Sequence, residues 1–392
     1  MSTRNLLDAV VVGAGVVGAA GALALAQLGL EVALVEATAP PPWRAAQRDL
    51  RVYAFAPDNA ALLDALGAWR GVVDARAQPY RRMRVWDAAG GGELAFDADA
   101  FGRRELGWII EHGLLVDRLW ARLHDAGVRV LCPARVTALA QDADGVRVQL
   151  DDGSRLATRV LVAADGADSS VRALVGADAP RHDYGQRGVI AYVATERPHE
   201  DTAWQRFLPG GPLAFLPCTD GLSSIVWSVP DAEATRLLAL DDATFGGELS
   251  RGFGARLGHA APASARAAFP LRRQLVDSQV AGRVLFVGDA AHVVHPLAGQ
   301  GVNLGLRDVA GLRDTVAAAL RRRGDWSSTQ RLQRWARTRR SENSVAAYSF
   351  EGLQRLFGSE DVAATLLRGP LLGVAGRVPS LAHLFWRRAS GL

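Results

Sequence analysis

A glycine, an aspartate and a glycine-rich run follow one predicted strand and could together bind a ligand. Residues 283–287 form a short apolar run, the pattern of a buried parallel strand, and Gly288 and Asp289 come directly after it. In open α/β sheets the carboxyl ends of such strands face the ligand, so Asp289 would offer a carboxylate there. Gly-Asp pairs also occur in simple turns, because both residues favour turn geometry. The pair therefore indicates a ligand site only if other segments of the chain converge on it.

The amino-terminal segment supplies a second glycine turn, between a strand and a helix. Residues 7–12 are apolar, Gly13, Gly15 and Gly18 follow in the spacing GxGxxG, and residues 19–28 favour a helix. In this arrangement the first glycine permits the tight turn, the second lets backbone N–H groups approach a pyrophosphate, and the third lets the helix pack on the strand. The positive amino end of the helix attracts the anion. The segment therefore predicts a dinucleotide site.

An acidic residue ends the second predicted strand. Residues 31–36 are mostly apolar, and Glu36 stands at the end of the run. A carboxylate at this point accepts hydrogen bonds from a ribose diol and disfavours a 2′-phosphate. A glycine triplet alone is also compatible with a purely structural turn. The complete βαβ unit with its terminal acid favours a dinucleotide, and these residues leave NAD and FAD both open.

A third predicted strand ends in an Asp-Gly pair. Residues 159–164 are apolar, the pair begins at Asp165, and Arg172 follows it. A turn followed by a helix that Asp168 or Ser169 caps explains this segment equally well on its own. Together with the other two segments it places a third polar loop at the same edge of the sheet. We therefore expect Asp165 and Arg172 to contact cofactors.

The order of these motifs along the chain, GxGxxG, then DG, then GD, resembles that of the class A flavoprotein aromatic hydroxylases. Within that class, the run 295–308 is similar to the signature of the ubiquinone-biosynthesis hydroxylase family. Three further runs are similar to that family at corresponding places: residues 49–55, 79–87 and 106–112. The similarity covers most of the chain and weakens after Arg337. His112 departs from the pattern, because relatives often carry asparagine there, near the flavin.

The resemblance implies that the dinucleotide is FAD, and it gives several residues a role. Glu36 would bind the adenosine ribose, Arg51 would neutralise a phosphate, and Asp289 would bind the ribityl chain or the pyrophosphate. A surface arginine without a ligand is the alternative at Arg51. The expected cofactor-binding residues are Gly13, Gly15, Gly18, Glu36, Arg51, His112, Asp165, Asp289, Pro296, Gly301, Val302 and Asn303.

The resemblance also implies a loop against the flavin ring, and we expect the catalytic centre there. Its residues are Pro296, Gly299, Gln300 and Gly301, and the glycines would avoid a clash with the ring. The helix that follows would direct its amino end at the ring and stabilise negative charge on it. The sequence identifies no acid or base. His292 and His295 lie inside the cofactor motif, where packing or loop hydrogen bonds explain them at least as well as proton transfer.

The implied reaction is aromatic hydroxylation. NAD(P)H would reduce FAD, O₂ would add at C4a to give a C4a-hydroperoxyflavin, and one oxygen atom would pass to the ring of a prenylated phenol or quinol intermediate of ubiquinone biosynthesis. The sequence leaves open which ring carbon reacts and whether NADPH or NADH is used. Two alternatives also stay open. One is a hydroxylase of a soluble aromatic metabolite, and the other is a non-catalytic flavoprotein scaffold of a quinone-biosynthesis complex.

Composition excludes several other classes of protein. All 45 basic residues are arginine, so a lysine Schiff base and a Walker-type phosphate loop are excluded. The arginines are interspersed with 41 acidic residues, which argues against nucleic-acid binding. Cys132 and Cys218 form no CxxC pair, so neither a metal site nor a disulfide framework is indicated. The absence of a signal peptide or an apolar span predicts a cytoplasmic location, with peripheral contact at the inner membrane face as a further expectation.

We expect an α/β fold in which a Rossmann-like FAD-binding domain is interleaved with a mixed-sheet substrate domain and is followed by C-terminal helices. The expected ranges are 1–75, 100–180 and 268–330 for the FAD-binding domain, 76–99 and 181–267 for the substrate domain, and 331–392 for the C-terminal helical region. Strands are predicted at 188–195, 213–217 and 223–229, with a hairpin at Asp220. Residues 366–388 mix apolar side chains with arginines. They suit an interfacial membrane anchor, a helix packed on the body, or a subunit interface.

Overall fold

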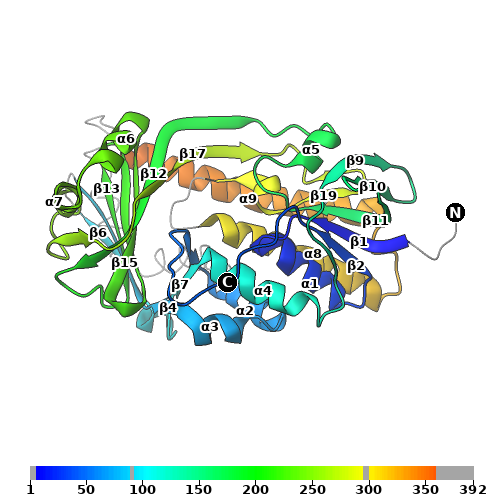
Figure 1. Cartoon of the computed structure of the whole chain (residues 1–392), viewed down its shortest axis with the longest axis horizontal. Helices are drawn as coiled ribbons and strands as arrows, with labels where there is room; N and C mark the ends of the chain where they lie inside the picture. The colour runs from blue at the N-terminus through cyan, green and yellow to red at the C-terminus, as the bar shows by residue number, and fades with distance from the viewer. Residues whose placement is uncertain (1–5, 89–91, 295–299, 359–392) are drawn as a thin grey trace.

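The computed structural model describes residues 6–88, 92–294 and 300–358, and in the last range the side chains of residues 301–345. Figure 1 shows a mostly parallel sheet with its helices at one end of the molecule and a second, mixed sheet at the other. The predicted α/β architecture of two interleaved units is confirmed.

The first sheet has a parallel core in the order β19, β11, β1, β2, β8. Its strands and the hairpin attached to it are β1 (Leu6–Val12), β2 (Val32–Val35), β8 (Arg129–Leu131), β9 (Val136–Gln141), β10 (Val146–Leu150), β11 (Arg155–Ala163), β18 (Val280–Ala281) and β19 (Val284–Phe286). Successive side chains of a strand face opposite sides, so Val11 joins one hydrophobic cluster and Val10 and Val12 join another. The first cluster lies under the helices α1 (Val16–Ala26), α4 (His112–Leu123) and α8 (Gln300–Arg321). The second lies under the β9–β10 hairpin and α5 (Ser170–Leu174).

The second sheet, which we call the substrate sheet, is centred on long antiparallel strands. Its strands are β5 (Arg82–Asp87), β6 (Glu93–Asp97), β12 (Arg181–Thr195), β13 (Thr202–Leu208), β14 (Gly211–Pro217), β15 (Leu222–Pro230), β16 (Ala260–Pro262), β17 (Ala267–Leu275) and β20 (His292–Val293). The helices α6 (Asp231–Ala239) and α7 (Asp242–Gly252) cover its outer face, where Phe215, Trp227 and Phe245 belong to one apolar cluster.

The three strands predicted for the substrate domain are confirmed within β12, β14 and β15. The hairpin prediction is also confirmed, because Asp220 and Gly221 both have positive φ, +63° and +72°, between the antiparallel strands β14 and β15. One boundary differs from the expected division. Residues 268–275 belong to β17, which pairs with β12 in the substrate sheet from Ala267↔Ile190 to Gln274↔Arg181. The β12–β17 pair forms a two-stranded arm between the two units, so local apolar patterning could not assign β17 to one of them.

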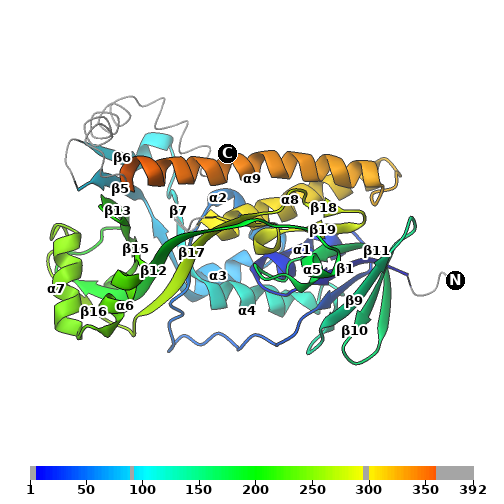
Figure 2. The ribbon, with the colours of Figure 1, turned by 90° about the horizontal axis from the view of Figure 1, so that it is seen from above.

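A small three-stranded sheet and a long helix connect the two units. The small sheet consists of β3 (Val52–Phe55), β7 (Gly107–Glu111) and β4 (Ala77–Tyr80), with α2 (Pro57–Ala65) and α3 (Trp69–Arg76) beside it. Figure 2 shows α9 (Thr329–Gly358) running along the molecule from the first sheet to the substrate sheet, where it contacts β13 and β14. Among the described helices, none is both long and apolar enough to cross a membrane. The segment 366–388 lies outside the described residues, so its membrane contact stays a prediction.

Candidate functional site

Four of the predicted motifs meet at one edge of the parallel sheet. The register pairs Val12 with both Val35 and Ala163, and Ala163 with Phe286, so these four strands end side by side. The GxGxxG turn, Glu36, the DG motif and the GD turn (Gly288–Ala290) follow them directly. Carboxyl edges of parallel strands are where open α/β sheets bind ligands. The structure therefore brings segments from distant parts of the sequence to one possible site.

The three glycines of the first turn differ in what surrounds them. A Cβ on Gly13 would lie 2.4 Å from the Ala164 carbonyl oxygen, and one on Gly18 would lie 1.9 Å from the Gly13 carbonyl oxygen. Gly13 also has φ +94°, so both positions require glycine for the fold. A Cβ on Gly15 would have no neighbour within 4 Å among the described residues. The space over Gly15 is open, and this is where the motif predicts a pyrophosphate.

The amino end of α1 is prepared for an anion. Its N-cap residue, Gly15, provides no side-chain cap, and the first turn carries no acidic residue. The backbone N–H groups there are left for another acceptor, and the helix dipole favours a negative one. The neighbouring loop is fixed by Trp120, whose indole Nε1 donates to the Ala14 carbonyl oxygen at 2.8 Å.

Glu36 lies across the glycine turn at the end of β2. Its Oε2 accepts a hydrogen bond from the Ala14 backbone N–H at 2.6 Å, and its Oε1 accepts one from the Thr38 N–H at 3.1 Å. The side chain is half-buried, so the carboxylate is held in place while part of it stays accessible. Carboxylate oxygens have several lone pairs, which leaves capacity for a ribose diol. Ribose binding by Glu36 stays a prediction.

The DG motif is held by hydrogen bonds within its own loop. Asp165 accepts hydrogen bonds from the Ser169 and Ser170 hydroxyls and from the Val171 N–H, at 2.6, 3.2 and 3.0 Å. Ser169 caps α5, as one of the two alternatives predicted, by accepting from the Arg172 N–H. Arg172 is buried, and it donates to the carbonyl oxygens of Ala167 and Ala290. Arg172 thereby links the DG loop to the GD turn, and direct contact of Asp165 with a cofactor stays a prediction.

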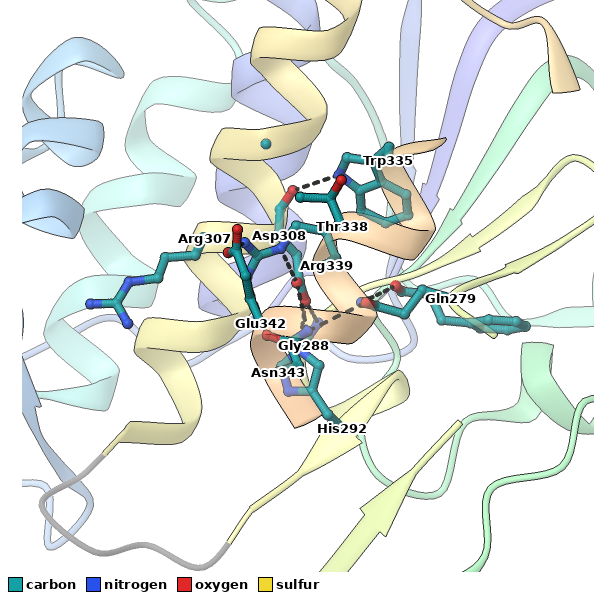
Figure 3. A network of polar contacts seen from close by, with 12 residues as sticks. Gln279, Gly288, His292, Arg307, Asp308, Trp335, Thr338, Arg339, Glu342 and Asn343 are labelled. Carbon is teal, nitrogen blue, oxygen red and sulfur yellow. Dashed lines mark hydrogen bonds and ion pairs between the residues drawn. The ribbon is translucent and has the colours of Figure 1, made fainter. Parts of the chain in front are cut away.

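Beneath the GD turn lies a buried carboxylate that the sequence did not single out. Asp308 of α8 is fully buried, and its Oδ2 accepts from the Gly288 N–H at 3.1 Å and from His292 Nε2 at 2.6 Å. Its Oδ1 accepts from Arg339 Nε at 2.9 Å and from Asn343 Nδ2 at 3.0 Å. Figure 3 shows the side chains of His292, from β20, and of Arg339 and Asn343, from α9, converging on Asp308. Burial alone would raise the pKa of this carboxyl, but His292 and Arg339 outweigh it and hold the pKa well below its usual value.

This network shows that His292 forms a hydrogen bond within the protein, as the loop-bonding alternative predicted. With Nε2 bound to an ionised carboxylate, the histidine serves to hold the GD turn, and its Nδ1 is buried without a hydrogen-bond partner among the described residues. Arg339 and Asn343 come from α9, which was expected to lie in a separate C-terminal region. The sequence did hold a signal for them. Trp335, Arg339 and Asn343 follow one another at intervals of four, and so form one face of a helix.

Asp289, the aspartate of the GD turn itself, has surroundings that differ from those of Asp308. It is half-buried, and it forms no ion pair with any described residue. It is close enough to Tyr53 to oppose ionisation of the Tyr53 hydroxyl. Arg51 and His112, two predicted cofactor residues, lie at the same place: the Arg51 guanidinium carbon is 5.5 Å from the Tyr53 ring centre, and the Tyr53 hydroxyl is 3.0 Å from His112 Nδ1. The structure therefore brings Asp289, Arg51 and His112 together around Tyr53, which the sequence did not predict.

The amino end of α8 is the remaining predicted part. A Cβ on Gly301 would meet nothing within 4 Å in the described part of the chain, whereas the Val302 and Asn303 side chains are buried. Asn303 accepts from the Ala56 N–H at 2.9 Å and donates to the Ala54 carbonyl oxygen at 2.8 Å, so its side chain binds α8 to β3. Any contact of these two residues with a cofactor would use their backbone N–H groups. Pro296, Gly299 and His295 lie outside the described residues, as does the side chain of Gln300.

The residues present fit a bound dinucleotide. An uncapped helix end and the open space over Gly15 suit a pyrophosphate, and a carboxylate at the end of β2 suits a ribose. The open space at Gly301, beside the amino end of a second helix, suits a flat ring carrying negative charge. Among the described residues there is no group of three or more His, Cys, Asp or Glu side chains able to hold a metal ion.

The comparisons with known proteins agree with this geometry. Residues 7–344 match the model of a family described as FAD binding domain. A protein of Rhodospirillum rubrum named ubiquinone hydroxylase UbiL is 37% identical over 392 residues, covering 100% of this chain and 91% of its own length. The 3-demethoxyubiquinol 3-hydroxylase of Escherichia coli is 36% identical, with 88% of each chain covered. The solved structure of p-nitrophenol 4-monooxygenase PnpA from Pseudomonas putida has the same fold, with a TM-score of 0.76, 20% identity and 98% of each chain covered.

The family match ends one residue beyond Asn343, so it includes both sheets and the network under the GD turn. The cofactor predicted from the motif order is confirmed as FAD. The chain belongs to the FAD binding domain family, and within it this protein is an FAD-dependent monooxygenase.

Proposed function

We propose that this monooxygenase hydroxylates the aromatic ring of a prenylated phenol or quinol intermediate of ubiquinone biosynthesis, with NAD(P)H as reductant and O₂ as the oxygen source. The observation that carries the proposal is the match to the Rhodospirillum rubrum ubiquinone hydroxylase along the full length of this chain. The Escherichia coli relative, at 36% identity, carries a name of the same chemical class. Both comparisons cover the substrate sheet as well as the FAD-binding unit.

We assign the cofactor-binding roles to groups whose surroundings suit them. The backbone N–H groups around Gly15 would bind the pyrophosphate, Glu36 the ribose, and Arg51 a phosphate. Asp289, which has no ion-pair partner among the described residues, would accept a hydrogen bond from a hydroxyl of the ribityl chain. The amino end of α8 would lie next to the ring. FAD, when bound, supplies the transfer of one oxygen atom from O₂ to the substrate ring.

The junction between the two units suits an apolar substrate. One cluster of buried side chains joins β3 and β7 to the inner face of the substrate sheet, through Ala54, Ile109, Tyr192 and Leu216. Half-buried apolar side chains pack around this cluster from both units: Leu50, Val52, Tyr80, Met83, Leu222 and Val226. An apolar junction excludes water from the reacting atoms, which prevents loss of the activated oxygen to solvent. It also offers an isoprenoid chain apolar surface to cover.

Gated reduction of the flavin tests the proposal. The holoenzyme is mixed anaerobically with NADPH, and loss of the flavin absorbance is followed alone, with a phenol that carries a short isoprenoid chain, and with the same phenol without the chain. We expect the prenylated phenol to accelerate reduction more than the unprenylated one. Equal acceleration by both phenols would favour a hydroxylase of a soluble aromatic metabolite. Slow reduction in all three mixtures would favour a scaffold without turnover.

A further inference from the structure

The side chains of Tyr53 and His112 face each other at the predicted cofactor site. Their surroundings indicate which of the two donates the hydrogen bond between them. Tyr53 comes from β3, and His112 is the first residue of α4. The Tyr53 hydroxyl oxygen lies 3.0 Å from His112 Nδ1, and the two rings are nearly perpendicular, with centres 5.8 Å apart. The backbone fixes this geometry, because the His112 N–H donates to the Arg51 carbonyl oxygen at 2.8 Å and β3 pairs with β7 immediately beside it.

His112 is neutral at physiological pH. Burial is the main cause and the Arg51 charge adds to it, so that the pKa of His112 falls to about 4, although Asp49 opposes the shift. A neutral imidazole carries one N–H donor and one acceptor nitrogen. Which nitrogen carries the hydrogen is set by the hydrogen bond that the other one forms.

The Tyr53 hydroxyl is the donor in this pair. Burial raises the pKa of Tyr53, so the phenol keeps its proton. The Arg51 guanidinium carbon lies 5.5 Å from the Tyr53 ring centre, and a guanidinium carries only donors, so Arg51 cannot accept the O–H of the phenol. His112 Nδ1 is the partner of the O–H, and it must accept. The ring hydrogen of His112 is therefore on Nε2.

The donor at Nε2 has no hydrogen-bond partner among the described residues, and it is not one of their buried unpartnered atoms. This nitrogen is therefore accessible to a ligand, on a half-buried side chain whose other ring nitrogen contacts Tyr53. An asparagine at this position would have a permanent N–H donor in its amide. A histidine offers one at this nitrogen only in the correct tautomer, unless it is charged.

We propose that Tyr53 is a positioning residue, which holds His112 in the Nε2–H tautomer so that His112 donates a hydrogen bond to an acceptor oxygen of bound FAD. Tyr53 itself does not need to touch the cofactor. The inference concerns FAD binding alone, and it stands whichever aromatic substrate the enzyme takes.

A double-mutant cycle tests the coupling. FAD dissociation constants are measured from the flavin fluorescence released on dilution of the holoenzyme, for the wild type, Tyr53→Phe, His112→Asn and the double variant. We expect Tyr53→Phe to weaken FAD binding about fivefold, the factor that one net hydrogen bond is worth. We expect His112→Asn to bind FAD within about twofold of the wild type, and Tyr53→Phe to have no further effect in that background.

Tyr80→Phe is the matched control, because it removes the hydroxyl of a second tyrosine of the same small sheet, which is half-buried and has a pKa that burial raises to about 12. It should leave the FAD dissociation constant unchanged. Equal weakening by Tyr53→Phe in the wild-type and His112→Asn backgrounds would overturn the proposal, and so would no weakening in either.

The tautomer can also be observed directly in the unmodified protein. Nitrogen NMR of the holoenzyme labelled with ¹⁵N-histidine distinguishes a protonated from an unprotonated ring nitrogen, and His112→Asn identifies the signals of His112. We expect Nε2 to carry the hydrogen from pH 6 to pH 8. A hydrogen on Nδ1 in the wild-type protein would contradict the proposal, even if Tyr53→Phe failed to fold.

Discussion

At the scale of single residues, this chain uses chemically identical groups for different purposes. Gly13 and Gly18 are required by packing, because a Cβ at either would collide with backbone atoms, whereas a Cβ on Gly15 would enter open space. The sequence predicted all three from their spacing. It could not predict Tyr53 or Asp308, because an isolated tyrosine in a strand and an acid in a helix carry no local pattern. Their roles come from neighbours that lie tens of residues away.

The glycines give a prediction that separates binding from folding. Gly15→Ala should fold with a thermal stability close to that of the wild type but should bind FAD at least about tenfold more weakly, because its methyl group would occupy the space proposed for the pyrophosphate. Gly18→Ala should lose stability by about 1–3 kcal/mol as its methyl group meets the Gly13 carbonyl. Melting temperatures of the apoproteins and FAD titrations measure the two effects. Normal FAD affinity in Gly15→Ala would place the pyrophosphate elsewhere.

His112 gives a prediction about pH. Its pKa is about 4 in the folded protein against 6.5 as its ordinary value, so between these values the unfolded chain binds a proton at this position that the folded chain does not. Stability must therefore fall as the pH drops from about 6.5 to about 4. His112→Asn removes this loss, and we expect it to gain about 2 kcal/mol relative to the wild type over that interval. Urea unfolding at pH 7 and pH 4.5 measures the difference, and parallel losses in both proteins would contradict it.

At the scale of helices and strands, the local units were predictable and their partners were not. The βαβ unit of β1, α1 and β2 and the strands that carry the DG and GD motifs follow from apolar runs that end in glycine or aspartate. The membership of β17 in the substrate sheet depends on pairing with β12, which lies far earlier in the chain. The role of α9 depends on which residues its buried face contacts. No pattern within a segment records such long-range contacts.

The contact between α8, α9 and the GD turn gives a prediction at this scale. Asp308→Asn would remove the buried ion-pair partner of Arg339 and leave it paired only with the exposed Glu342, so we expect a loss of stability of about 3 kcal/mol. Asn343→Ala removes one hydrogen bond to the same carboxylate and should cost about 1–3 kcal/mol. Both variants should also release FAD more readily, because Asp308 holds the Gly288 N–H of the GD turn. Chemical unfolding and FAD retention on gel filtration measure these effects; unaltered FAD retention in Asn343→Ala would show that α9 does not support the turn.

The sign of the pH effect follows from the lowered pKa of Asp308. Its contribution to stability is fully present above about pH 4, the range of its ordinary pKa, and declines as the solution becomes more acidic, since only the unfolded chain then gains the proton. Wild type and Asp308→Asn should therefore differ most at neutral pH and converge toward pH 2.

At the scale of the whole molecule, the parallel sheet and the substrate sheet must together enclose one reaction site. The predicted architecture of interleaved units is confirmed, because the chain crosses between them several times and each crossing ends in a cofactor motif or a substrate strand. One contact between the units could not be predicted. Arg48, from the loop before β3, donates to the Thr219 carbonyl oxygen at 3.2 Å and forms an ion pair with Asp220, at the tip of the β14–β15 hairpin. Tyr192 of the substrate sheet donates to the Asp49 carbonyl oxygen at 2.8 Å beside it.

This contact predicts how tightly NADPH oxidation is coupled to hydroxylation. Arg48→Ala should weaken the contact between the substrate sheet and the loop before β3 and let water reach the site. The fraction of NADPH oxidation that yields hydrogen peroxide should therefore rise about fivefold. Asp220→Asn should have a much smaller effect, because Asp220 is 76% exposed and an exposed ion pair contributes little. Peroxide assays during turnover measure both. An unchanged peroxide fraction in Arg48→Ala would show that this contact does not close the site.

The measurement that tests the central claim most directly is incorporation of labelled oxygen. The holoenzyme is incubated with NADPH, ¹⁸O₂ and a phenol bearing a short isoprenoid chain, and the product is analysed by mass spectrometry beside a reaction with the unprenylated phenol. We predict one ¹⁸O atom in each hydroxylated prenylated product, and much slower conversion of the unprenylated phenol. Oxidation of NADPH that yields only hydrogen peroxide, or equally fast hydroxylation of the unprenylated phenol, would contradict the proposed function.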